Sequence, residues 1–121
     1  YILEKPEQIL KEIHRVLKSG GKLFLTSPFI FNEAKEPVDY WRFTGQGLEK
    51  IVKESGLNNF FIEPVGERFS AAVYLISPFL FFWPIKFAFY CLALLFDKMI
   101  PKKLKLKQPC PIGYFVKAQK L

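Results

Sequence analysis

An apolar strand framed by two helical segments is the feature that most limits how this chain can fold. Residues 22–27, Lys-Leu-Phe-Leu-Thr-Ser, have no polar alternation in their middle. Such a run is typical of a strand that is covered on both faces, as in parallel sheets. The order helix, strand, loop, helix predicts half of an α/β sheet domain. Ligands of such domains bind outside the carboxyl ends of the strands, so the loop after residue 27 is where we expect a site.

The segment before this strand predicts an amphipathic helix over residues 7–18. Pro6 suits the first helical turn, where its missing N–H costs nothing. Apolar residues recur at helical spacing on one face: Ile9, Leu10, Ile13, Val16 and Leu17. The sequence Ser-Gly-Gly at 19–21 then ends the helix, with a glycine in the left-handed conformation. A phosphate-binding glycine loop would have the opposite order, with the strand before it and the helix after it.

A loop of about 15 residues follows the strand, and this length favours a functional or lid-like segment. It ends in the hexapeptide Asp-Tyr-Trp-Arg-Phe-Thr at residues 39–44. Thr44 is a suitable N-cap for a helix over residues 45–55. Two further strands are expected, over residues 59–65 and 112–118.

The stretch from residue 69 to residue 96 carries a single charge, Lys86, and two interior prolines, Pro78 and Pro84. As one helix it would be about 42 Å long, but the prolines argue against one straight rod. Split near Pro84, each half is about 20 Å long, too short for a hydrocarbon core of about 30 Å. We therefore expect two short helices, hinged near residues 77–84, that lie in a membrane interface or enter one leaflet.

The positive charge of the chain is concentrated beside this stretch. Residues 1–68 contain ten acids and ten Lys or Arg, whereas residues 69–121 contain eight Lys and one acid, Asp97. Lysines that follow an apolar segment favour an anionic membrane surface over nucleic acid as the partner. No aromatic residues alternate with these lysines as in a stacking platform for bases. The alternative is that the apolar helices cap the domain's own core or form a dimer interface.

The cysteines and the histidine predict neither a disulfide nor a metal site. Cys91 lies in the apolar stretch, Cys110 lies in a proline-flanked turn, and His14 is the only histidine. Residues placed in this way have no disulfide framework and no metal-ligand spacing. We expect a cytoplasmic protein that is either free or peripheral on the inner face of the membrane.

Three segments resemble the C-terminal half of class I S-adenosylmethionine-dependent methyltransferases: EIHRVLKSGGKLFLTSPF, DYWRFT and GLEKIVKESGL. Domains of that family have a Rossmann-like α/β fold whose sheet has the strand order 3-2-1-4-5-7-6, with strand 7 antiparallel. The resemblance implies that residues 22–27, 60–64 and 112–118 are strands 5, 6 and 7, with flanking helices. It assigns residues 1–68 and 108–121 to the methyltransferase domain, and residues 69–107 to a hydrophobic helical insertion with a basic flank.

The resemblance also implies that the cofactor is S-adenosylmethionine. The family binds it chiefly through a glycine-rich loop after strand 1 and an acid that ends strand 2, and neither occurs in these 121 residues. We therefore expect an incomplete fragment of an enzyme that transfers a methyl group to a small-molecule, sugar or lipid-linked acceptor. A non-catalytic remnant that binds a membrane or a protein partner is the alternative.

Candidate cofactor and strand-end residues come from two places. The opening Ile-Leu-Glu resembles the segment just after strand 4, often Leu-Glu-His, so Leu3 and Glu4 would touch the cofactor from that side; a lysine replaces the histidine here. Ser27, Pro28 and Phe29 end strand 5 and lie at the edge of the site by topology, where they would contact the substrate.

The hexapeptide supplies the remaining candidates. Tyr40 and Trp41 would line the acceptor pocket, or would pack the loop onto the sheet. Asp39 is the best-placed general base for a hydroxyl acceptor, unless it orders its own loop or pairs with Arg42. Arg42 would hold an anionic acceptor group, or would form a structural bridge to Asp39 or Glu36.

Overall fold

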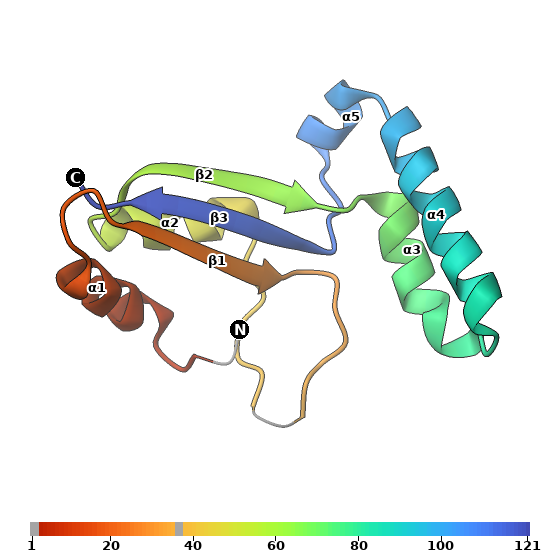
Figure 1. Ribbon diagram of the computed structural model, residues 1–121, viewed down its shortest axis with the longest axis horizontal. Helices are drawn as coiled ribbons and strands as arrows, with labels where there is room; N and C mark the ends of the chain where they lie inside the picture. The colour runs from red at the N-terminus through yellow and green to blue at the C-terminus, as the bar shows by residue number, and fades with distance from the viewer. Residues whose placement is uncertain (1–2, 36–37) are drawn as a thin grey trace.

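The computed structural model describes residues 3–35 and 38–121. Three strands form its sheet: β1 (Lys22–Pro28), β2 (Asn58–Val65) and β3 (Gly113–Gln119), in the order β1-β3-β2. β3 runs antiparallel to both neighbours, and Val116 pairs with Leu25 on one side and Ile62 on the other. β1 and β2 therefore run in the same direction, and their carboxyl ends meet at one edge of the sheet (Figure 1). This confirms the expected order 5-7-6 with a reversed strand 7.

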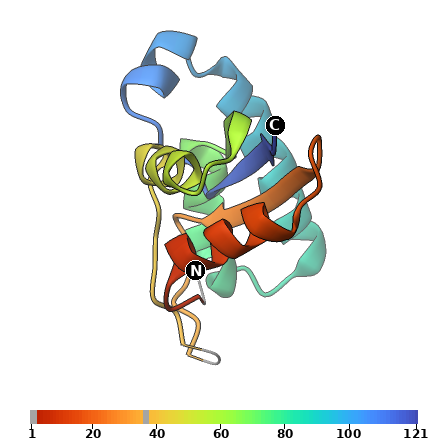
Figure 2. The ribbon, with the colours of Figure 1, turned by 90° about the vertical axis from the view of Figure 1, so that its left-hand side faces the viewer.

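Two helices, α1 (Pro6–Val16) and α2 (Gly45–Glu54), lie side by side on one face of this sheet (Figure 1, Figure 2). Thr44 caps α2 as predicted, because its Oγ1 accepts a hydrogen bond from the Gly47 N–H at 3.1 Å. Gly20, with φ of +77°, supplies the left-handed residue in the turn from α1 to β1. The buried core lies between the helices and the sheet, and is formed by Leu10, Leu48, Ile51, Val52, Leu57, Tyr114, Val116 and Ala118.

The prediction that β1 is covered on both faces was wrong. Burial alternates along the strand: Leu23 and Leu25 are partly buried against the core, whereas Phe24 is 58% exposed. Phe24 stacks on Phe115 of β3, with ring centroids 6.1 Å apart, and this pair lies on the open face of the sheet. The physical reason is that α1 and α2 pack on the same face of the sheet. The described part of the chain therefore covers one face of β1 and leaves the other face open.

The apolar stretch forms a helical hairpin, as expected from its two prolines. It consists of α3 (Arg68–Ile76), the short 3₁₀ helix η1 (Ser77–Phe79) and α4 (Trp83–Met99). We call residues 68–99 the apolar hairpin. α3 and α4 pack against each other and project beyond the carboxyl edge of the sheet, and a short lysine-rich helix, α5 (Lys102–Lys107), follows (Figure 1). In the described residues, each helix is too short or too polar to cross a membrane.

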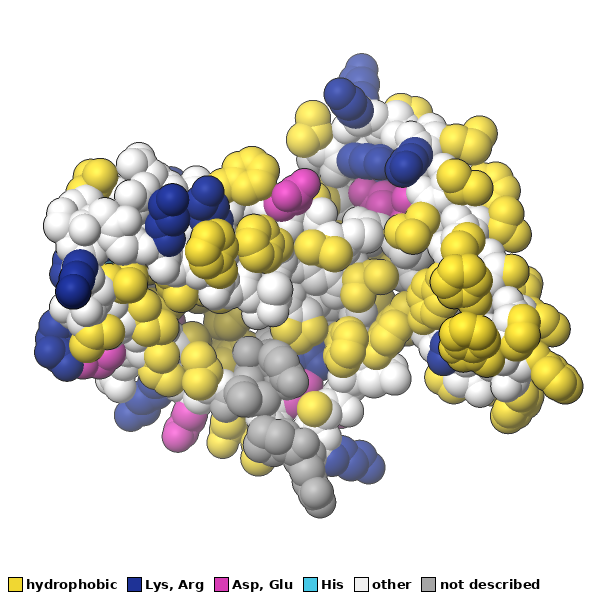
Figure 3. Space-filling view, viewed as in Figure 1, with side chains coloured by type: hydrophobic (Ala, Val, Ile, Leu, Met, Phe, Trp, Pro, Cys, Tyr) yellow, Lys and Arg dark blue, Asp and Glu magenta, His cyan; other side chains and the backbone are white. Residues whose placement is uncertain are grey.

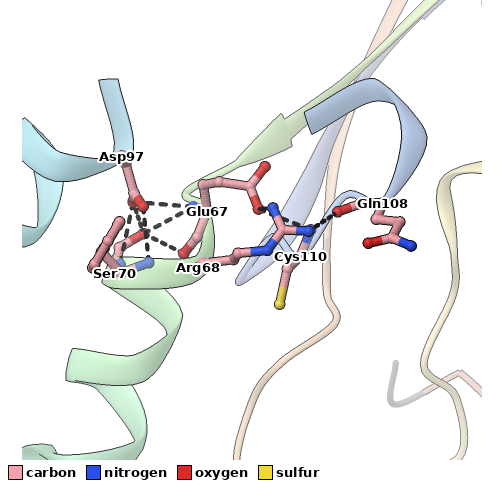
Figure 4. A network of polar contacts seen from close by, with 7 residues as sticks. Glu67, Arg68, Ser70, Asp97, Gln108 and Cys110 are labelled. Carbon is pink, nitrogen blue, oxygen red and sulfur yellow. Dashed lines mark hydrogen bonds and ion pairs between the residues drawn. The ribbon is translucent and has the colours of Figure 1, made fainter. Parts of the chain in front are cut away.

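A buried carboxylate joins the two helices of the apolar hairpin. Asp97 of α4 is only 6% exposed, and it accepts hydrogen bonds from the backbone N–H groups of Glu67, Phe69 and Ser70 at 3.2, 2.9 and 3.2 Å. The Ser70 hydroxyl also contacts it (Figure 4). Glu67 is the N-cap residue of α3, and Phe69 and Ser70 lie in its first turn, where the N–H groups have no intrahelical acceptors. Asp97 therefore caps α3 from the neighbouring helix and places a negative charge at its positive end.

Glu67 attaches this cap to the sheet side of the molecule. Its carboxylate accepts the Cys110 N–H at 3.0 Å and pairs with Arg68 at 3.2 Å, while Arg68 also donates to the Gln108 carbonyl (Figure 4). The chain between α5 and β3 is thus held against the base of the apolar hairpin. The base is polar and buried, so the exposed apolar side chains lie along the helices and at the far end.

Candidate functional site

The candidate site lies at the carboxyl edge of the sheet, between the loop of residues 29–44 and α3. The loop leaves β1 at Pro28, and β2 leads into α3 at the same edge (Figure 1). Gly113 begins β3 between them, and a Cβ at this position would lie 2.7 Å from the Ser27 carbonyl oxygen. A side chain there would force β1 and β3 apart, so glycine permits the close approach of the strands beside the site.

Asp39 and Arg42 form an ion pair inside the loop. Both guanidinium NH₂ groups of Arg42 donate to the Asp39 carboxylate, which also accepts the Ala34 N–H at 3.2 Å. The Asp39 side chain is 3% exposed and that of Arg42 is 27% exposed. Arg42 donates further to the Asn32 and Trp41 carbonyls, at 3.3 and 3.1 Å. These contacts are those expected of a pair that orders the loop; the proposed bridge from Arg42 to Glu36 lies outside the described residues.

The bidentate contact with Arg42 is the main cause that lowers the pKa of Asp39 below its usual value, and the Ala34 N–H lowers this pKa further. The carboxylate is therefore held in its charged form at neutral pH. A lowered pKa makes it a weaker proton acceptor for a hydroxyl, because an effective general base has a pKa close to the working pH. Its use as the catalytic base stays a prediction.

This pKa shift predicts the acid sensitivity of the loop. A group whose pKa is lowered on folding stabilises the fold above its unfolded pKa of about 3.9, and this contribution disappears as the pH falls through the lower folded value. We expect the Trp41 emission, followed in a Trp83→Phe background, to stay constant from pH 7 to about pH 4 and to change only below that. Asp39→Asn should lack this acid transition. A transition of the parent protein centred above pH 5 would contradict the ion pair.

Tyr40 and Trp41 lie at the surface of the loop, with exposed fractions of 50% and 43%. Trp41 stacks on Phe43 with ring centroids 5.8 Å apart, and its Nε1–H donates to the Glu4 carbonyl at 3.4 Å. The loop thus meets the Leu3–Glu4 segment, as a shared site requires. An open hollow of about 270 Å³ is lined by Phe31, Glu33, Asp39, Tyr40, Trp41 and Arg42. We call it the loop hollow.

The strand-end candidates lie around a second hollow, of about 300 Å³, which is lined by Thr26, Ser27, Pro28, Phe31, Val65, Ile112, Gly113 and Tyr114. Phe31 belongs to both hollows, so they are neighbours. Ser27 is 4% exposed, and its Oγ has no hydrogen-bond partner among the described residues. Phe29 packs edge-on against Tyr114, with centroids 5.9 Å apart, and so contributes to the core rather than to either hollow.

Leu3 lines a smaller apolar cavity of about 140 Å³ between α1, α2 and β1, and it is 39% exposed. Ser27 lines the same cavity from the strand. Leu3 and Glu4, the end of β1 and the loop therefore converge on one edge of the sheet. No cluster of His, Cys, Asp and Glu that could hold a metal ion occurs within residues 3–35 and 38–121.

Two contacts between the loop and the apolar hairpin were missed by the sequence analysis. Phe31 stacks on Tyr74 of α3, with centroids 5.0 Å apart and an interplanar angle of 17°. The Asn32 N–H donates to the Tyr74 hydroxyl at 3.1 Å. The local signal for this link is a tyrosine in the apolar second half of α3, where a packed Tyr hydroxyl needs a hydrogen-bond partner.

Comparison with known proteins gives structural neighbours alone. No family model matches the sequence, and no curated protein matches it. Two solved structures of phosphoethanolamine N-methyltransferase 2 from Haemonchus contortus match 98% of the chain, at 20% identity, with TM-scores of 0.53 and 0.54. One is in complex with phosphomonomethylethanolamine and S-adenosylhomocysteine, and the other with S-adenosyl-L-methionine.

The chain spans about 30% of the length of these two enzymes. At this level of identity the match establishes the fold. The strand order β1-β3-β2, with the middle strand reversed, is the one expected of strands 5, 7 and 6. The chain therefore has the fold of part of a methyltransferase domain, and its strand order is that of the C-terminal half.

Proposed function

We propose that this chain supplies the acceptor side of an S-adenosylmethionine-dependent methyltransferase. The observation that carries the proposal is the reversed β3 between β1 and β2, with a structured loop at their carboxyl edge, in a fold shared with two methyltransferase structures. Open α/β sheets bind their ligands at this edge. The proposed cofactor is S-adenosylmethionine, which the neighbouring enzyme binds in one of its structures.

Few residues are needed for the chemistry, because the bound cofactor would supply an electrophilic methyl group on a good leaving group. The protein must hold the acceptor in line and exclude water, and such positioning accounts for much of the rate. Leu3 and Glu4 would touch the cofactor from their side of the site. The Glu4 carbonyl lies beside the loop, where it accepts the Trp41 Nε1–H. The remaining cofactor contacts of this family do not lie in the 121 residues.

The loop hollow is the proposed acceptor site. The exposed rings of Tyr40 and Trp41 offer flat apolar surfaces, and the Asp39–Arg42 pair fixes the backbone that carries them. Because Arg42 is engaged by Asp39 and two carbonyls, we assign it to loop order rather than to holding an anion. A small molecule, a sugar or a lipid-linked headgroup is the acceptor class. Phosphomonomethylethanolamine, bound by the neighbouring enzyme, is a reasonable first compound to test.

Cofactor binding by the isolated chain gives a direct prediction. We expect residues 1–121 alone to bind S-adenosylmethionine weakly or not at all by calorimetry, because the sequence contains no glycine-rich cofactor loop. The same chain together with a preceding segment that encodes a strand, a glycine-rich loop and an acid some twenty residues later should bind the cofactor and transfer a methyl group. Micromolar binding of S-adenosylmethionine to residues 1–121 alone would contradict the proposal that most of the cofactor site lies in the preceding segment.

The methyltransferase proposal is tested by the reading frame upstream of Tyr1 and by transfer of a radiolabelled methyl group. A continuous upstream frame with those cofactor elements, and label incorporated into an acceptor, supports the enzyme. A start codon immediately before Tyr1 would favour the non-catalytic remnant instead. The two outcomes differ before any protein is made, so the sequencing step comes first.

A further inference from the structure

The apolar hairpin exposes far more hydrophobic surface than a protein surface in water ordinarily carries. Four aromatic side chains at its tip, Phe79, Phe81, Phe82 and Trp83, are between 72% and 90% exposed. Along α4, nearly every apolar side chain is exposed as well, and these side chains crowd over the two helices (Figure 3). A contiguous patch of this kind marks an interaction surface.

Between residues 69 and 96, the only charged side chain of the apolar hairpin is Lys86, which is half-buried. The residues of α4 that are buried or half-buried are Lys86, Tyr90, Ala93 and Asp97, spaced by four, three and four positions. This spacing puts them on one face of the helix. Asp97 on that face contacts α3, so Lys86 belongs to the seam between the helices rather than to the exposed surface.

Mostly exposed lysines surround the buried polar base of the apolar hairpin. Lys98 ends α4, and α5 adds Lys102, Lys103, Lys105 and Lys107. The single acid of residues 69–121, Asp97, is buried in the cap of α3, so no exposed carboxylate offsets these lysines within that range. The apolar surface is therefore bordered by positive charge at one end (Figure 3).

We propose that the apolar hairpin docks this protein on an anionic lipid surface by entering one leaflet. α4 has 17 residues, which gives about 26 Å of helix. This is less than the roughly 30 Å of a hydrocarbon core but more than the roughly 15 Å of one leaflet, so α4 would lie inclined to the membrane plane. A helix that is apolar on nearly all sides is suited to a nonpolar medium rather than to a water interface. Lysines around the base would meet anionic headgroups, and the preference of Trp83 for the interface region favours an inclined helix over an upright one.

A second copy of the chain fits this surface less well. Two copies paired in parallel through their apolar hairpins would bring two clusters of five lysines together, and two copies paired antiparallel would place the lysines of each beside the apolar tip of the other. In neither case does an exposed acid from residues 69–121 pair with them. Like charges brought together in this way oppose association. An anionic membrane complements both the apolar surface and the lysines.

The test is flotation of the full protein with phosphatidylcholine vesicles that contain or lack 30% phosphatidylglycerol. We expect binding to the anionic vesicles, and a loss of about 100-fold in the partition coefficient for Phe81→Ser with Phe82→Ser. The matched control is Phe24→Ser with Phe61→Ser, two aromatics that are each 58% exposed on the strands. This control should bind like the parent protein. Equal losses in both double variants would overturn the proposal.

Two further measurements use the folded parent protein or mild changes to it. Brominated lipids should quench tryptophan emission in the Trp41→Phe variant, and quench it less in the Trp83→Phe variant. Changing Lys102, Lys103, Lys105 and Lys107 to Gln should weaken binding to anionic vesicles by at least about 10-fold. Binding unaffected by these four changes would overturn the electrostatic part. The whole proposal would be overturned in favour of a second copy by two results together. The parent protein would be a dimer without lipid and would not bind vesicles, and the Phe81→Ser/Phe82→Ser variant would be a monomer.

Discussion

Replacement of Asp97 by alanine is expected to lower the free energy of unfolding by about 3 kcal/mol, the sum of a lost helix cap and of buried donors left without an acceptor. The side chain is 6% exposed, and it is the acceptor for the first-turn N–H groups of Glu67, Phe69 and Ser70. Without it the Phe69 and Ser70 N–H groups lose this acceptor, whereas the Glu67 N–H keeps the Ser70 Oγ at 2.9 Å. Urea unfolding followed by circular dichroism measures the loss.

Two variants make this result specific. Asp97→Asn keeps one acceptor oxygen, so its loss should fall between that of alanine and that of the parent protein. Lys98→Ala changes the adjacent exposed residue of the same helix, and should alter the free energy by less than about 0.5 kcal/mol. An Asp97→Ala variant that unfolds at the same urea concentration as the parent protein would show that the cap contributes nothing.

Replacement of Arg42 by alanine is expected to lower kcat/KM of the complete enzyme by about 100-fold, the scale of a misplaced acceptor. This prediction rests on the proposed function. Arg42 joins Asp39 to the Asn32 and Trp41 carbonyls. Its loss would therefore let the backbone on both sides of the loop hollow move. Steady-state kinetics with the methylated acceptor measure the effect, and cofactor binding should be unchanged because the change lies on the acceptor side.

Asp39→Asn is the companion variant, and it separates the two interpretations of Asp39. If the carboxylate only orders the loop, the amide keeps an acceptor for the Ala34 N–H, and the loss should be about 10-fold or less. A loss between about 100-fold and 10,000-fold, with Trp41 emission unchanged, would instead identify Asp39 as the general base. The double variant Asp39→Ala/Arg42→Ala should lose little more than Arg42→Ala alone, because paired residues act as a unit.

The features that the sequence predicted well depend on residues that are close together along the chain. Pro78 and Pro84 interrupt an apolar stretch, and the two helices of the apolar hairpin end and begin beside them. Thr44 carries its own capping oxygen to the third residue of α2. The ion pair of Asp39 with Arg42, which are three positions apart, was likewise foreseeable as one of two alternatives. The strand order came from the family resemblance, since no local pattern encodes which strands are neighbours.

The features that the sequence did not predict depend on contacts between distant residues. Asp97 stands out only as an isolated acid, and its donors lie 27 to 30 positions earlier. The Tyr74 hydroxyl meets a loop N–H that is 42 positions away. The apolar composition of β1 also gave no sign that Phe24 would be exposed, because hydrophobicity alone does not tell which face a helix covers. The roles of Leu3, Ser27 and Tyr40 at the site remain predictions.

Phe31 lines both hollows, and the ring of Tyr74 from α3 stacks on it. A shift of α3 relative to the sheet would therefore change the shape of the wall that Phe31 forms. Free-energy coupling between two binding events is reciprocal. If vesicle binding changes the affinity of the protein for the acceptor by some factor, a saturating acceptor must change its affinity for vesicles by the same factor. Measuring either binding equilibrium therefore reports on the other.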